Sequence, residues 1–167
     1  TGPDFCQRKK ELEWLRELVE SAGRVYLVGE RRIGKSSLVA EAVRPLKAMR
    51  AVFVDLMAVK DIEDLTHRVG QAVLASETRQ SRVLSLMRSL SSLRPSVTVD
   101  SLTGSPSVTF APGAGRQLET LDELFAAIAK WKRAVVVLDE FQDVLTLGDS
   151  RQILARLRSL VQTEQKV

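Results

Sequence analysis

The sequence predicts a single α/β domain in which a mainly parallel sheet is flanked by helices. Short apolar runs of the kind found in buried parallel strands alternate along the chain with segments of helical periodicity. The 167 residues are 44% hydrophobic and 28% charged, with only 9 Gly and 5 Pro. This composition is typical of a globular protein with a packed core and excludes disordered or collagen-like sequence.

The first third of the chain alternates helix and strand. Apolar residues recur at helical spacing over residues 8–20, which predicts an amphipathic helix. Residues 25–28 read Val-Tyr-Leu-Val and predict a buried strand. A turn that contains Gly29 and Gly34 follows. After it we expect a helix that ends before Pro45. Residues 51–56 predict a second buried strand, and Asp61 begins the next helix.

The middle of the chain departs from this alternation. Helical spacing over residues 81–93 predicts a helix that Pro95 ends. Apolar and polar residues then alternate on both sides of residues 101–105, which predicts a hairpin with a longer loop. We interpret residues 95–115 as an insertion.

The last third returns to helix and strand. Thr120 and Glu123 match a capping box, which predicts that a helix starts there. Residues 134–138 form a third apolar run, and Asp139 and Glu140 follow it directly. Ser150 is expected to cap a final helix.

Charge and cysteine content narrow the function classes. The formal net charge is +4, and all of the excess lies in the first 50 residues. A duplex-binding face needs a sustained basic stripe, so a solvated surface explains the charge better. The single cysteine, Cys6, cannot form an intrachain disulfide, and no apolar run approaches the length of a membrane span. We therefore expect a cytoplasmic protein.

Residues 29–36 fit the Walker A phosphate-loop pattern G-x-x-x-x-G-K-[ST] at the junction of a predicted strand and helix. Glycines let such a loop curl, so that backbone N–H groups point at phosphate oxygens near the positive end of the helix. Lys35 then reaches the β- and γ-phosphates, and Ser36 ligates Mg²⁺. The candidate nucleotide-binding residues of the loop are Gly29, Glu30, Arg31, Arg32, Ile33, Gly34, Lys35, Ser36 and Ser37.

The strand that ends in Asp139 and Glu140 fits a Walker B site. A buried strand holds a carboxylate rigidly near a metal at the carboxyl edge of the sheet. Asp139 is the candidate Mg²⁺ ligand. Glu140 is the candidate catalytic residue that polarises the attacking water. Taken alone, this pattern also fits a strand that ends in a solvated acidic loop.

Three motifs in order resemble those of the archaeal-type ATPases, a P-loop family related to the AAA+ and STAND groups. Residues 29–38 resemble that family's G-x-R-R-x-G-K-T-S-L loop, and residues 137–142 resemble its h-h-D-E-F-Q segment. Phe5 and Arg8 match its N-terminal motif F-x-G-R-x-x-E-L, which in the family lies near the adenine. Gln7 replaces the usual glycine of that motif.

The resemblance implies a three-layer P-loop ATPase domain that uses ATP and Mg²⁺. It divides the chain into an N-terminal segment and helix (1–22), the phosphate-loop region (23–94), the hairpin insertion (95–115) and the Walker B region (116–167). It also implies that the sensor strand, the lid and any arginine finger lie beyond residue 167. We therefore expect this piece alone to be weakly active or inactive, and protein partners or self-association to use the regions beyond it.

The favoured activity is ATP hydrolysis that drives or gates a conformational change. The chain contains no Asn, so the N-K-x-D segment by which Ras-like GTPases recognise guanine is missing from it. Two alternatives stay open. One is a slowly hydrolysing switch controlled by nucleotide occupancy, and the other is an ATP-dependent nucleic-acid loader. Arg31 and Arg32 either contact phosphate, reach a partner subunit's nucleotide or form surface ion pairs.

Overall fold

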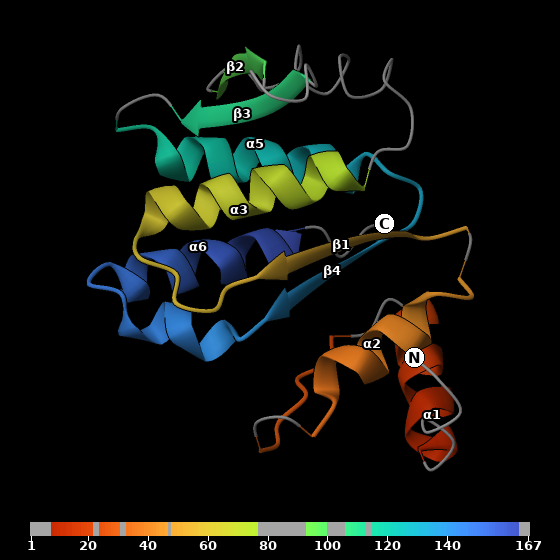
Figure 1. Cartoon of the computed structure of the whole chain (residues 1–167). Helices are drawn as coiled ribbons and strands as arrows, with labels where there is room; N and C mark the ends of the chain where they lie inside the picture. Colours follow the sequence, from red (N-terminus) through yellow and green to blue (C-terminus); the bar gives the residue numbers. More distant parts are fainter. Residues whose placement is uncertain are drawn as a thin grey trace. The chain divides into compact units, whose positions relative to one another are not determined.

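The computed structural model describes residues 8–21, 24–30, 33–46, 48–76, 93–99, 106–112 and 115–163. The chain divides into two compact units, Thr1–Ala51 and Val52–Val167, which are described separately below. Helices and strands are mixed, and one small sheet is parallel (Figure 1). This arrangement is compatible with the predicted α/β class.

The first unit is built on two helices, α1 (Lys9–Glu20) and α2 (Lys35–Val43), which pack against each other (Figure 1). Leu15 of α1 and Leu38 of α2 are almost fully buried in their shared apolar core. Both helices agree with the sequence expectation. Their burial is the main stabilising contribution here, because helices of 12 and 9 residues are marginal in isolation.

The prediction of a strand at residues 25–28 is wrong. The described residues 24–30 contain no regular secondary structure. Val25 and Leu27 pack on the helix pair, whereas Tyr26 and Val28 are 83% and 95% exposed. The alternation of a strand is therefore present, but no described backbone of the first unit pairs with it, and a strand requires such a partner.

The sheet of the second unit consists of β1 (Arg50–Asp55), which begins at the boundary between the units, and β4 (Ala134–Asp139). The two strands run in the same direction (Figure 1). The N–H of Leu56 donates to the Asp139 carbonyl at 3.1 Å and continues the pairing past the end of β1. Both strand predictions are thus confirmed, and the carboxyl ends of β1 and β4 lie side by side.

Three helices, α3 (Ile62–Ala75), α5 (Gln117–Ala129) and α6 (Ser150–Thr163), form the core of the second unit with this sheet. Helix α5 contacts both α3 and α6. In β1, Val52 and Val54 are buried, whereas Phe53 on the other face is 46% exposed. The predicted buried strand is therefore buried on one face only.

The predicted hairpin is confirmed as β2 (Leu93–Val99) and β3 (Pro106–Pro112), an antiparallel pair in which Val97 lies opposite Val108. Strand β3 lies against α3 (Figure 1). The helix predicted over residues 81–93 falls outside the described residues except at Leu93, where a strand replaces it. Pro95 is tolerated there because both strands of a two-stranded ribbon are edge strands.

Two helix starts test the capping rules. Helix α3 starts as predicted, because the Asp61 carboxylate accepts from the Asp64 N–H at 2.8 Å. Helix α5 starts at Gln117, so the capping box predicted at Thr120 is wrong. Thr120 is fully buried inside the first turn, and its hydroxyl donates to the Arg116 carbonyl at 2.9 Å. The hydroxyl is therefore satisfied by the preceding turn.

Candidate active site

The predicted phosphate loop lies in the first unit and has a residue of left-handed backbone conformation just before α2. Gly34 has a φ of 82° and directly precedes α2, and its carbonyl accepts from the Leu38 N–H at 2.9 Å. A side chain is disfavoured at such a φ, which explains the glycine at this position of the pattern. Lys35, Ser36 and Ser37 are the first three residues of α2, and the N–H groups of a first helical turn point toward the helix N-terminus.

Lys35 folds back over the start of its own loop. Its Nζ donates to the Gly29 carbonyl at 2.9 Å and to the Glu30 carbonyl at 2.8 Å. These bonds hold the ammonium group against the backbone of Gly29 and Glu30. A positive charge beside a helix N-terminus favours the binding of anionic oxygen atoms.

Gly29 lies close to the side chain of Ile33. A Cβ added at Gly29 would lie 2.7 Å from Cδ1 of Ile33, the flexible end of that side chain, which would have to move. The Ile33 side chain is itself 41% exposed. Arg31 and Arg32 lie outside the described residues, and their three predicted alternatives stay open.

The second unit carries the two predicted carboxylates at the end of β4. Asp139 is the last residue of the strand, and its Oδ1 accepts from the Glu140 N–H at 3.0 Å. Glu140 has a φ of 51°, which places a non-glycine residue in the left-handed region. That conformation costs about 1–2 kcal/mol, and strained residues of this kind cluster at functional sites.

The 3₁₀ helix η2 (Phe141–Thr146) continues directly from Glu140 and supports it in two ways. The Gln142 side-chain amide donates to the Glu140 carboxylate. The Asp143 N–H donates to the Glu140 carbonyl at 3.0 Å. The position of the Glu140 side chain is thus tied to its own turn.

Asp143 also links the ends of the two strands. Its Oδ2 accepts from the N–H of Ala58 at 2.7 Å, in the loop that follows β1. Ala58 has a φ of 52° and is, with Glu140, one of two left-handed residues other than glycine in the described chain. Both therefore lie at the carboxyl edge of the sheet, where α/β proteins place their ligands.

The side chain of Arg68 also holds the loop that follows β1. Arg68 of α3 binds both carboxylate oxygens of Asp64, at 3.0 and 3.1 Å. It also donates to the carbonyls of Asp55 and Met57 at 2.9 and 3.1 Å. The hydrogen bonds from Arg68 lower the pKa of Asp64, against the opposing effect of partial burial, and Asp64 raises the pKa of Arg68.

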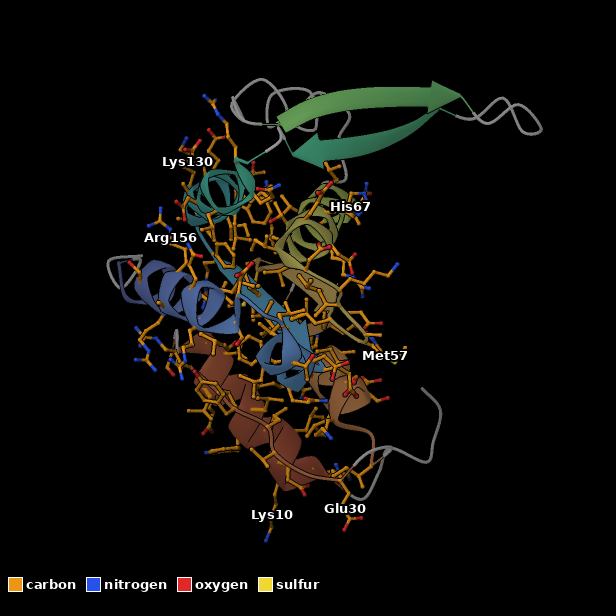
Figure 2. All side chains as sticks on the ribbon, turned by 90° about the vertical axis from the view of Figure 1, so that its left-hand side faces the viewer. Lys10, Glu30, Met57, His67, Lys130 and Arg156 are labelled. Carbon is orange, nitrogen blue, oxygen red and sulfur yellow. The ribbon has the colours of Figure 1, made fainter. Side chains whose placement is uncertain are left out.

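Asp55, the last residue of β1, has a local role. Its Oδ1 accepts from the Met57 N–H at 2.9 Å and so caps the loop that follows its strand. Met57 is 53% exposed at this edge (Figure 2). Among the described residues, no three His, Cys, Asp or Glu side chains gather as a metal site.

The predicted site residues are therefore divided between the units. The loop residues and Arg8, which directly precedes α1, belong to the first unit, and Asp139 and Glu140 belong to the second. Phe5 lies outside the described residues. Sequence reasoning missed Asp143, Ala58 and Arg68. The spacing of Asp64 and Arg68, four residues apart on a predicted helix, could have indicated their ion pair, whereas nothing in the sequence marks Ala58.

The mixture of helices and strands with one small parallel sheet is compatible with an α/β nucleotide-hydrolase fold. Residues 5–167 match the family described as an ATPase domain predominantly from Archaea, and the chain belongs to this family. Searches of curated proteins and of solved structures each found no match. The suspected family is thereby confirmed, and ATP-related activity follows from it. Among the described helices, none has the length and apolar character needed to cross a membrane.

Proposed function

We propose that this chain binds ATP with Mg²⁺ and hydrolyses it, and that turnover drives or gates a conformational change. The observation that carries the proposal is the loop geometry in a chain of an ATPase family. The Lys35 ammonium group lies within hydrogen-bond reach of the loop carbonyls of Gly29 and Glu30, directly before the N-terminus of α2.

The loop is proposed to bind the triphosphate of ATP. An added Cβ at Gly34 would meet no heavy atom of the described residues within 4 Å. Lys35 and the N–H groups of the first turn of α2 are the donors that hold the β- and γ-phosphates. Phosphate oxygens replace the carbonyls of Gly29 and Glu30 as acceptors for Lys35. Phe5 and Arg8 are proposed to lie near the adenine, as the family resemblance implies.

The donor set also fits Mg²⁺, which proteins commonly bind through one or two side chains together with phosphate oxygens and water. Ser36 and Asp139 are the proposed ligands. The ion would neutralise the charge that develops on the phosphates. We further propose that the complete domain has a three-layer P-loop fold.

Glu140 is proposed to orient the attacking water. Its carboxylate accepts a proton from water as the oxygen attacks the γ-phosphorus, and the bond to the β–γ bridging oxygen breaks. The products are ADP and inorganic phosphate. The Gln142 amide donates to the Glu140 carboxylate and restricts its rotation, which supports this role.

Two substitutions test the proposal in the full-length protein. Glu140→Gln preserves the size of the side chain and removes its negative charge, so nucleotide should remain bound while steady-state turnover falls by about 100-fold or more. Asp139→Asn should weaken nucleotide binding only when Mg²⁺ is present. Hydrolysis at the parent rate in both variants would show that the two carboxylates merely end a strand.

A further inference from the structure

We propose that Gln142 is a positioning residue that holds the Glu140 carboxylate for catalysis; the inference rests on the function proposed above. The observation is the hydrogen bond from the Gln142 amide to Oε2 of Glu140. An amide nitrogen can only donate, and a carboxylate can only accept, so the contact has a defined direction.

The backbone conformation of the turn brings Gln142 close to Glu140. Glu140 has a left-handed backbone conformation, and the Asp143 N–H donates to its carbonyl. The chain therefore turns tightly after β4. Gln142 comes two residues later, inside this turn. The bond from the Ala58 N–H to Asp143 fixes the turn against the loop after β1. The backbone that carries Gln142 is therefore held in place by hydrogen bonds on both sides of it.

Apolar packing does not explain why a glutamine occupies position 142. The residue is exposed, and the apolar contacts that stabilise this region come from its neighbours, chiefly buried Val144 and the half-buried Phe141. One oxygen of Glu140 is bound by the amide, which restricts rotation of the carboxylate. Restricting a reacting group to its productive geometry accelerates a reaction without changing substrate affinity.

The test uses Gln142→Met in the full-length protein, because methionine has a similar length and no donor. We expect kcat to fall about tenfold, the effect of one hydrogen bond to a charged group, with the KM and Kd for ATP unchanged. Gln152→Met, an exposed glutamine on α6, is the matched control and should retain the parent kcat. Equal melting temperatures of the variants would show that folding is intact.

A double substitution separates this inference from the proposed function. If Gln142 acts through Glu140, adding Gln142→Met to Glu140→Gln should cause no further loss in single-turnover rate. A second independent loss, or a parent kcat for Gln142→Met alone, would overturn the positioning role. Parent turnover in Glu140→Gln would instead contradict the proposed role of Glu140 itself.

Discussion

Two residues at the carboxyl edge of the sheet adopt a conformation that their side chains disfavour. Ala58 and Glu140 have φ values of 52° and 51°. Each follows one of the two parallel strands, and Asp143 connects their turns. Strain at this scale persists only where surrounding contacts impose it, and here those contacts hold the proposed catalytic turn.

Substitution of Ala58 tests this strain. Ala58→Gly should raise the free energy of unfolding by about 0.5–1 kcal/mol, because glycine adopts a positive φ without a Cβ clash. The matched control is Ala155→Gly on the exposed side of α6, which should lower it by about 1 kcal/mol. Urea titration measures both values. The same loss in both variants would show that the conformation at Ala58 is unstrained.

At the scale of elements, the loop between β1 and α3 is held by an ion pair whose strength depends on pH. The side chains of Asp64 and Arg68 are only 24% and 28% exposed. Arg68 also donates hydrogen bonds to two carbonyls of the loop. Because the pKa of Asp64 is lower in the folded state, its stabilising contribution is present above the unfolded pKa. It is lost as the pH falls through the folded pKa.

Asp64→Asn should therefore reduce the free energy of unfolding by about 1 kcal/mol near neutral pH. The difference from the parent should shrink as the pH falls below about 4, where the carboxylate of the parent also becomes protonated. Glu63→Gln, at an exposed neighbour in the same turn, is the control and should have little effect. Chemical denaturation across this pH range measures the effect. A difference that does not change with pH would contradict the assignment.

Elements with strong periodicity could be predicted from the sequence. Helices α1 and α3 and strand β4 were predicted from regularly spaced apolar residues, which pack into the cores on which these elements depend. Residues 25–28 have the same local pattern, but no backbone among the described residues of the first unit pairs with them. Local sequence does not reveal whether a pairing partner is present, so this prediction failed.

Turns were harder to predict than helices and strands. Thr120 matches a capping pattern, yet burial directs its hydroxyl to the carbonyl of Arg116. The left-handed turn at Glu140 carries no glycine that would have marked it. In the candidate site, the loop and both carboxylates were recognised as motifs. The contacts of Gln142 and Asp143 depend on the turn geometry and could not be predicted.

At the scale of the whole molecule, each unit contributes one part of the proposed chemistry. The first holds the loop with Lys35, and the second holds Asp139, Glu140 and the supports around them. Family membership over residues 5–167 covers both parts. The loop must therefore bind phosphate, because the roles proposed for the carboxylates depend on a bound triphosphate.

The most direct test of this requirement is titration calorimetry of the full-length protein with ATP and Mg²⁺. Lys35→Ala should weaken binding by about 100-fold or more, because it removes the charged donor of the loop. Lys130→Ala is the matched control, since Lys130 points into solvent at the end of α5 (Figure 2). The control should bind as the parent does. Unchanged ATP affinity in Lys35→Ala would contradict the assignment of residues 29–36 as a phosphate loop.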